Sequence, residues 1–264
     1  MSQSTLTKRI EFSASHRYHN PSWDAGRNRA VFGICNNEPS HGHNYLLEVT
    51  IGGTVDPITG MIINLYDLKR VLVDIVEEFD HKHLNLDTPY FQEIIPTTEN
   101  LAVVFWNIIS QRPETKEVES VRVYEGEDLF SEVRAEGNDS RVITPAHTDI
   151  RVTRRYRFSS GFSGPDNTVS WSSCILDITI SGPIAPDTGR VVDIDTVDTL
   201  VQQQILKRFH QQDLTNLPAF GSQPASPEHV SCLIQSLLEP HMPSGHLDTI
   251  TLTDSQGTAT QFCR

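Results

Sequence analysis

Apolar side chains along the first half of the chain follow two different periods, and these periods predict strands and helices. Residues 6–13 alternate between two faces, as in a half-buried strand, and residues 44–52 are predicted to form a second strand. Residues 118–125 and 129–135 form two further predicted strands, and Gly126 between them indicates the turn of a hairpin.

Two helices are predicted between these pairs of strands. Apolar side chains recur at helical spacing along residues 65–79, and Asn64 precedes them as an N-cap. A second helical stripe covers residues 101–109; the chain enters it through Thr98, and Pro113 lies beyond its end. The order ββααββ predicts an α+β fold, in which an antiparallel four-stranded sheet carries both helices on one face.

A weak internal repeat connects the two halves of the chain. Residues 51–69, which contain Asp-Pro-Ile-Thr-Gly, match residues 180–198, which contain Ala-Pro-Asp-Thr-Gly. The two matched stretches start 129 residues apart in the sequence (51 and 180). Nearer the start of each copy, Phe12 matches Phe158, and these two residues are 146 positions apart. The second copy has therefore lost part of the chain between its first two strands.

This repeat predicts how the chain is divided into domains. Residues 1–136 form the first unit, and residues 137–150, which include Gly-Asn-Asp-Ser and Thr-Pro, have the composition of a linker. Residues 151–264 form a second, diverged unit of the same fold.

Three histidines of the first unit are candidate metal ligands. His41 and His43 are two residues apart, so in a strand both imidazoles project from the same face, and His16 could lie alongside on a neighbouring strand. Three neutral imidazoles suit Zn²⁺ and leave its fourth position open, as in catalytic sites. The same residues could equally be polar histidines at strand ends without a metal, because so short a motif has real false-positive risk.

Cys35 lies six residues before His41, close enough for a loop to return its thiol to the same metal. It could be a fourth ligand of a structural site, or a thiolate base whose pKa is lowered by nearby positive charge. In the second unit, Phe162, Ser170 and Ser172 stand where the first has its three histidines. We therefore expect the second unit to bind no zinc and to perform no catalysis unaided.

Composition narrows the class of protein. The chain has 264 residues and a formal net charge of −13, with no basic run that would bind a phosphate backbone, so we expect no nucleic acid partner. No apolar run approaches the ~20 residues of a membrane span, and no hydrophobic signal region begins the chain. The four cysteines show no CxxC spacing. These features predict a cytoplasmic protein without a membrane partner.

Short motifs recur in a characteristic order through about residue 135. The first is Phe12–Arg17, and the second is Cys35–Tyr45, which has five residues between the cysteine and the first histidine. Further motifs are Asp56-Pro57, Thr59-Gly60-Met61, Asn64-Leu65, Asp67-Leu68-Lys69, Asp80-His81-Lys82, Thr97-Thr98-Glu99-Asn100 and Val123-Tyr124-Glu125. Together these motifs, over roughly half of the chain, resemble the 6-pyruvoyl-tetrahydropterin synthase and 6-carboxy-tetrahydropterin synthase family.

The resemblance implies a fold and a reaction. The fold is the tunnelling fold, or T-fold, present here as two tandem units of which the second is degenerate. The reaction is the zinc-dependent conversion of 7,8-dihydroneopterin triphosphate to 6-pyruvoyl-tetrahydropterin, an internal redox tautomerisation that eliminates triphosphate. The protein would thus be a carbon–oxygen lyase of tetrahydrobiopterin synthesis, with a small pterin as substrate and Zn²⁺ as cofactor.

The resemblance also implies roles for individual residues. Cys35 would be the catalytic base, with Asp80 and His81 as a relay beside it. Glu125 would anchor the pterin by accepting hydrogen bonds from its two-donor amidine edge. Thr97 and Thr98 would line the same pocket, although helix capping alone could explain both threonines.

The resemblance to this family also leaves two alternative functions and predicts an oligomeric state. 6-Carboxy-tetrahydropterin synthase of queuosine synthesis uses the same substrate and zinc, but typically has three residues between the cysteine and His-Gly-His; the five found here favour the pyruvoyl enzyme. A non-catalytic pterin-binding or assembly protein is the other hypothesis. Because the family closes its units into rings, we expect a homo-oligomer with active sites at unit–unit boundaries.

Overall fold

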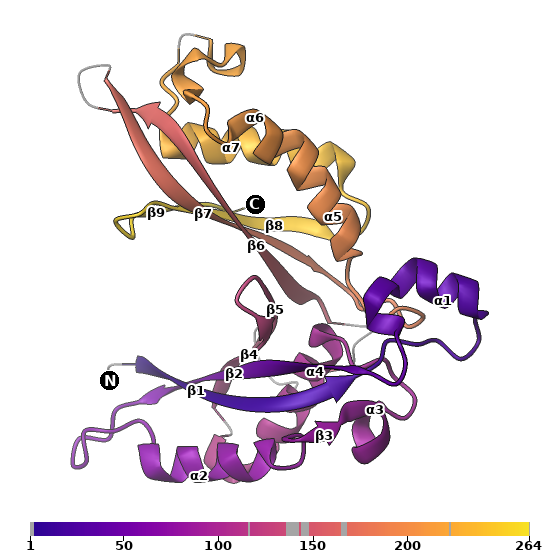
Figure 1. The fold of residues 1–264 in the computed structure, drawn as a ribbon. Coiled ribbons are helices and arrows are strands. Elements are labelled where there is room, and N and C mark those ends of the chain that lie inside the picture. The colour runs from indigo at the N-terminus through magenta and orange to yellow at the C-terminus, as the bar shows by residue number, and fades with distance from the viewer. Residues whose placement is uncertain are drawn as a thin grey trace. The chain divides into compact units, whose positions relative to one another are not determined.

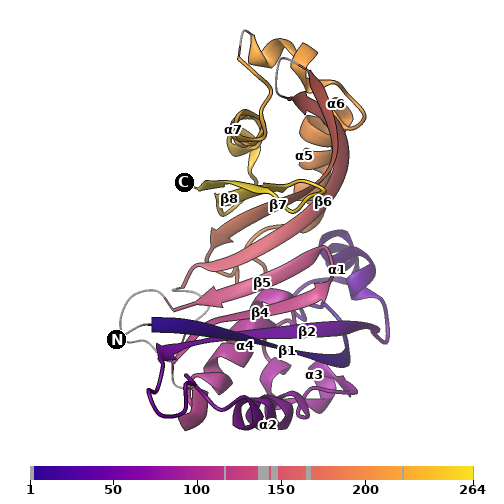
Figure 2. The same ribbon diagram turned by 90° about the vertical axis from the view of Figure 1, so that its left-hand side faces the viewer.

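The computed structural model of the chain contains both helices and strands, which confirms the predicted α+β class (Figures 1 and 2). It divides into two compact units: unit 1 is Met1–Arg151 with Pro183–Arg190, and unit 2 is Val152–Gly182 with Val191–Arg264. The structure describes residues 3–115, 117–135, 143, 148–164, 168–221 and 223–263. Most of the predicted linker lies outside these residues.

The sheet of unit 1 has the strand order β3-β1-β2-β4-β5. The long strands pair antiparallel, whereas β3 contributes only two residues and pairs parallel to β1. The strands are β1 (Gln3–His16), β2 (His41–Thr54), β3 (Lys82–His83), β4 (Val118–Gly126) and β5 (Leu129–Arg134).

Two long helices, α2 (Leu65–Val76) and α4 (Thr98–Ile109), lie on one face of this sheet (Figure 2). Asn64 caps α2 by accepting a hydrogen bond from the backbone of Tyr66, as its position before the apolar stripe predicts. The helix ends at Val76 rather than at residue 79. Two short helices, α1 (Ala25–Phe32) and α3 (Leu84–Asp87), were not predicted.

The core of unit 1 lies between the sheet and these helices. Alternate residues of β2, from Tyr45 through Leu47 and Val49, are fully buried against the helices, and Phe12 of β1 stacks on Tyr45 with ring centroids 5.0 Å apart. Because strand side chains alternate between faces, His43 lies on the same side of β2 as Tyr45. The buried face of the sheet therefore leads directly to the candidate metal ligands.

Unit 2 has a sheet in the order β6-β7-β8-β9, and its helices lie between β7 and β8 along the chain. Helix α7 packs on β8 and β9. The strands are β6 (Ile150–Ser163), β7 (Val169–Gly182), β8 (His246–Thr253) and β9 (Ala259–Cys263); the helices are α5 (Ile194–Val201), α6 (Lys207–Phe209) and α7 (Pro227–Leu238).

The two units share irregularities at positions that the sequence repeat matches. The register of β2 against β4 shifts between Thr50 and Ile51, and that of β7 against β8 shifts between Thr179 and Ile180. Helices α4 and α7 also begin and end at matching positions of the two copies. The same helix bounds and the same register shift thus occur at matching positions in both units. Local sequence propensity alone would not place both features at the same spacing.

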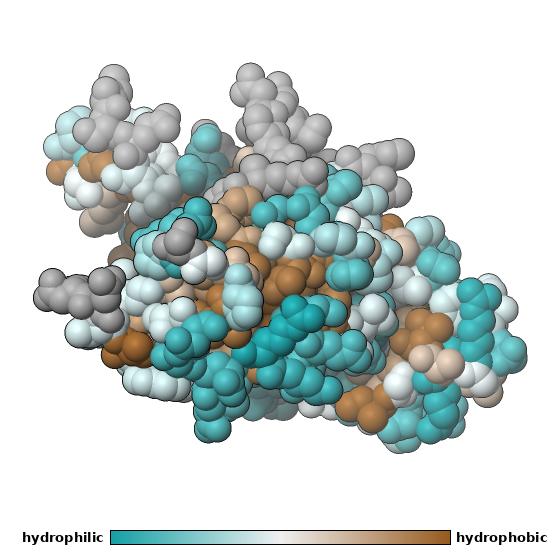
Figure 3. Space-filling model, turned by 90° about the horizontal axis from the view of Figure 1, so that it is seen from above, coloured by the Kyte–Doolittle hydropathy of each residue, from teal (hydrophilic) through white to brown (hydrophobic). Residues whose placement is uncertain are grey.

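Hydrophilic residues make up much of the face in Figure 3, around a group of hydrophobic residues near its middle. Within the described residues, no helix combines the length and hydrophobicity that a membrane-spanning segment needs.

Candidate metal centre and active site

The three candidate histidines meet at the ends of two neighbouring strands. His16 is the last residue of β1 and pairs with His41, the first residue of β2, while His43 pairs with Ala14. The Nε2 atoms of His16 and His41 lie 3.1 Å apart. Antiparallel pairing and the two-residue period of a strand therefore bring all three imidazoles together.

Glu125, near the end of β4, joins this group. Its Oε1 atom lies 3.4 Å from His16 Nε2 and 3.3 Å from His43 Nε2. The four ligand atoms all lie within 4.8 Å of one another, and no other such group occurs among the described residues. Two ligand atoms on one tetrahedral Zn²⁺, each at about 2.0–2.1 Å, are about 3.3–3.4 Å apart. The three distances, 3.1, 3.3 and 3.4 Å, are close to that separation, so these side chains could hold one metal ion.

The protonation of the histidines fits the same ion. Burial, followed by the charges of His41 and His43, lowers the pKa of His16 from 6.5 to about 2. Burial likewise lowers the pKa of His43 to about 4. Both imidazoles are therefore neutral near pH 7, as metal ligands must be. His41 Nδ1 and His43 Nε2 are buried and make no hydrogen bond within the protein.

Cys35 lies in the short 3-10 helix η1 (Gly33–Asn36), half-buried, and is not one of the four convergent ligands. Its backbone carbonyl accepts a hydrogen bond of 2.8 Å from Tyr18, and its side chain packs against the cluster of Tyr18, Phe32 and Ile95. The Tyr18 hydroxyl in turn donates to Glu125 Oε1 at 3.4 Å. One buried tyrosine thus connects the thiol segment with the metal group.

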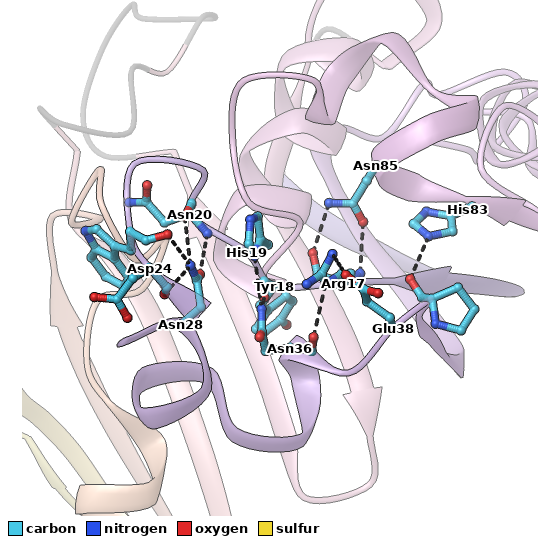
Figure 4. A network of polar contacts seen from close by, with 12 residues as sticks. Arg17, Tyr18, His19, Asn20, Asp24, Asn28, Asn36, Glu38, His83 and Asn85 are labelled. Carbon is cyan, nitrogen blue, oxygen red and sulfur yellow. Dashed lines mark hydrogen bonds and ion pairs between the residues drawn. The ribbon is translucent and has the colours of Figure 1, made fainter. Parts of the chain in front are cut away.

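A network of amide side chains fixes the loop that carries Cys35 (Figure 4). The side-chain amide of Asn36 donates to the backbone carbonyl of Tyr18 at 2.8 Å. The backbone carbonyl of Asn36 accepts a hydrogen bond from Arg17 Nε at 3.0 Å. Asn85 bonds both the backbone N–H and the carbonyl of Arg17, each at 2.9 Å. Asn28 bonds the backbone of Asn20 in the same two-sided way. This loop is the part that the second copy lacks.

Asp80 and His81 follow α2 and form a dyad. His81 Nδ1 lies 2.8 Å from Asp80 Oδ2, and Asp80 Oδ1 accepts from the Ser13 backbone at 2.8 Å. The His81 side chain is 82% exposed and lines a depression of about 580 Å³ together with Ser13 and Ser15, which point away from the core. The dyad is thus presented outward at the β3 edge of the sheet, whereas Cys35 packs inward beside Tyr18.

The start of α4 supplies a carboxylate to which the sequence assigned no role. Glu99 is 3% exposed, and its Oε2 accepts a hydrogen bond of 3.1 Å from Thr98 Oγ1, which itself accepts from Ser131. Thr97 caps the helix by accepting a hydrogen bond from the backbone of Asn100, which is the alternative role that the sequence left open for it. An acidic residue in a first helical turn is common, so only the burial of Glu99 distinguishes it.

The matching positions of unit 2 carry no comparable group among its described residues. Phe162, at the position of His16, is 5% exposed and belongs to the core. Cys174 takes the place of Tyr45; it is buried, and burial raises the pKa of its thiol.

Comparisons with known proteins show which family the chain resembles. A family model described as 6-pyruvoyl tetrahydropterin synthase matches residues 5–136 and 172–263. The 6-pyruvoyl tetrahydrobiopterin synthase of Homo sapiens is 43% identical over 124 residues, which cover 47% of this chain and 86% of that protein. A putative 6-carboxy-5,6,7,8-tetrahydropterin synthase of Archaeoglobus fulgidus is 38% identical over 94 residues, or 36% of this chain and 75% of its own length.

A solved structure supports the same relationship. The 6-pyruvoyl tetrahydropterin synthase of Caenorhabditis elegans superposes with a TM-score of 0.50 at 30% identity, covering 52% of this chain and 98% of that one. The family model extends over more than half of the chain and includes parts of both repeats. The chain therefore belongs to the 6-pyruvoyl tetrahydropterin synthase family.

Proposed function

We propose that this protein converts 7,8-dihydroneopterin triphosphate to 6-pyruvoyl-tetrahydropterin in a zinc-dependent reaction that eliminates triphosphate. The observation that carries the proposal is the convergence of three histidines and Glu125 on one point. Cys35 is connected to this group through Tyr18, whose backbone N–H donates to the Cys35 carbonyl and whose hydroxyl donates to Glu125. Membership of a pterin synthase family supports the choice of substrate.

His16, His41 and His43 would hold the zinc ion. When bound, zinc supplies Lewis-acid polarisation of oxygens on the substrate side chain, which makes the neighbouring carbons acidic. The Tyr45 hydroxyl, 2.6 Å from His16 Nδ1, orients that imidazole so that Nε2 faces the metal.

Cys35 is the proposed base that removes a proton from a side-chain carbon. The tautomerisation moves protons and electrons within the substrate, so no nicotinamide is needed, and triphosphate leaves as the oxygen–carbon bond breaks. Asp80 accepts a hydrogen bond from His81 and so holds its imidazole in one orientation, ready to pass a proton through the opposite nitrogen.

Two carboxylates share the recognition of the substrate in this proposal. The sequence interpretation gave the pterin ring to Glu125, but the distances of its Oε1 from two ligand nitrogens favour a position at the metal end. Glu99 is the buried carboxylate next to Thr98, and the two oxygens of a carboxylate match the two donors of an amidine edge. We assign the pterin ring to Glu99.

The second unit is, in this proposal, a diverged T-fold copy without metal or catalysis. It offers neither a counterpart of Cys35 nor the Asp-His pair, because His210 and Gln211 stand there instead. An outward-facing dyad in unit 1 suits a thiol from another chain. We therefore propose a homo-oligomer in which the active site is completed at a boundary between units.

Product analysis by mass spectrometry tests the function. The zinc-loaded protein, given 7,8-dihydroneopterin triphosphate, is expected to release 6-pyruvoyl-tetrahydropterin and triphosphate. A 6-carboxy product would identify the queuosine-type enzyme instead. Pterin binding without any product would indicate a binding or assembly protein.

A further inference from the structure

A segment from far along the chain packs into unit 1. Pro183–Arg190 comes from the second sequence repeat, yet its contacts group it with Met1–Arg151. Asn20 Nδ2 donates to the Asp187 carbonyl at 2.8 Å, and Thr97 Oγ1 donates to the Gly189 carbonyl at 2.5 Å. Pro186 of this segment also lines a cleft of about 660 Å³ with other residues of unit 1, none of which is a metal ligand or Glu99.

The first repeat contains the same turn in an undocked state. Gly60 donates to the Asp56 carbonyl at 2.8 Å, and Gly189 donates to the Ala185 carbonyl at 2.7 Å. Their φ angles are +68° and +71°. A Cβ at Gly60 would meet no atom within 4 Å, whereas a Cβ at Gly189 would lie 2.9 Å from Asn100 Nδ2. The same turn is therefore open to solvent in one copy and tightly seated in the other.

The seated turn ends in an arginine that reaches the aromatic residues beside the metal group. The Arg190 guanidinium lies 5.5 Å from the ring centroid of Tyr18 and 5.4 Å from that of Phe32, and its Nη1 donates to the Val31 carbonyl at 3.2 Å. Cations at this distance from an aromatic face are attracted to it. The matching residue of the first copy is Met61, which is 50% exposed.

Tyr18 transmits this contact to the site. Its ring lies 4.5 Å from the ring of His16, and its hydroxyl donates to Glu125. Thr97, which bonds Gly189, is the N-cap of the helix that carries Glu99. The segment thus touches the supports of both carboxylates and of one metal ligand.

We infer that Pro183–Arg190 is an integral wall of the first unit beside its pterin site, with Arg190 as a positioning residue for Tyr18 and Glu125. The inference rests on the proposed function for the identity of the ligand. In this inference the second sequence repeat, whose described residues hold no metal group, has a structural role in unit 1. It supplies Pro183–Arg190 to the unit that holds the metal group of the same chain. Arg190 touches no reacting atom in this assignment and acts through the tyrosine.

Matched alanine substitutions in the full-length protein separate docking from backbone strain. Gly189→Ala and Gly60→Ala carry similar strain, because both glycines have φ near +70°. Only the former crowds Asn100. Hydrogen exchange monitored by mass spectrometry is expected to show faster exchange at residues 95–100 in Gly189→Ala and no change there in Gly60→Ala. Equal exchange in both variants would overturn the inference.

Substitution of Arg190 tests the positioning role. Arg190→Met, which installs the residue of the first copy, is expected to raise KM for the pterin substrate roughly three- to tenfold while the melting temperature is kept. Arg190→Lys keeps a cation near the ring and is expected to recover most of the loss. An unchanged KM in Arg190→Met would overturn the role.

The two proposals fail in different ways. Absence of product from the unsubstituted, zinc-loaded protein would overturn the proposed function. Hydrogen exchange of the glycine variants needs no substrate, so it still decides whether Pro183–Arg190 is a wall of unit 1.

Discussion

The Tyr45 hydroxyl lies 2.6 Å from His16 Nδ1, on the side of the imidazole away from the other ligand atoms. Burial raises the pKa of Tyr45 well above its ordinary value, so the phenol stays protonated. When a metal binds Nε2, the proton of the His16 imidazole is on Nδ1. The Nδ1–H group then donates a hydrogen bond to the phenol oxygen of Tyr45. A hydrogen bond of this kind fixes the tautomer of a ligating histidine.

Tyr45→Phe should weaken zinc binding while the fold is kept. Phenylalanine retains the stacking on Phe12 but removes the hydroxyl, and loss of such a partner typically lowers metal affinity ~10–100-fold. Competition with a chromophoric chelator measures the change. Tyr66→Phe, on an exposed tyrosine of α2, is the control and should bind zinc as the unsubstituted protein does.

Metal analysis should find one zinc ion per chain. The four convergent ligand atoms lie in unit 1, and buried Phe162 occupies the matching histidine position of unit 2. His43→Ala should abolish the bound zinc, whereas His246→Ala, in unit 2, should leave it in place. Two zinc ions per chain would contradict the assignment of unit 2.

The sequence predicted the histidine group because its geometry is local. Two histidines two residues apart share a strand face, and His16 needed only the adjacent antiparallel strand. Glu125 could not be predicted as their neighbour, because its place depends on the register of β4 against β2, where Tyr124 pairs with Leu46. That register is set by packing over the whole sheet.

The same limit explains what else the sequence did not predict. Glu99 reads as an ordinary acid in a first helical turn until its burial is known. The seating of Gly189 against Thr97 joins residues 92 positions apart, and no local period encodes it. Helix α1 lacks an apolar stripe, since only Asn28 and Phe32 of its residues are buried.

Substitution of the two carboxylates should separate their roles. Glu99→Gln should raise KM for the pterin roughly 10–100-fold, as expected when a charge-assisted hydrogen bond is lost, with zinc affinity unchanged. Glu125→Gln should mainly weaken zinc binding. Steady-state kinetics and chelator competition distinguish the two effects. The opposite pattern would return the pterin contact to Glu125, as the sequence first suggested.

Mixing two inactive variants should test whether the site spans two chains. Cys35→Ala should lower turnover at least ~10²-fold, a typical loss for a positioned acid–base group, while zinc stays bound. His81→Ala removes the outward-facing member of the dyad. If thiol and dyad come from different chains, refolding the two variants together should restore activity that neither shows alone. Refolding each variant separately before mixing is the control. No recovery would assign both groups to one chain.

The metal-free protein should lose stability as the pH falls. The folded-state pKa of His16 is lowered to about 2 and that of His43 to about 4, against an ordinary value of 6.5. Between pH 6.5 and 4 the unfolded chain therefore binds protons at both positions that the folded protein does not. The free energy of unfolding is highest above pH 6.5 and falls with pH below it, by about 1.4 kcal/mol per pH unit for each such proton. His16→Phe, which installs the residue found in unit 2, removes one of these protons. The substitution should therefore lower the slope of the unfolding free energy against pH by about 1.4 kcal/mol per pH unit. Urea unfolding of the chelated proteins at several pH values measures it, and equal slopes would refute the shifted pKa of His16.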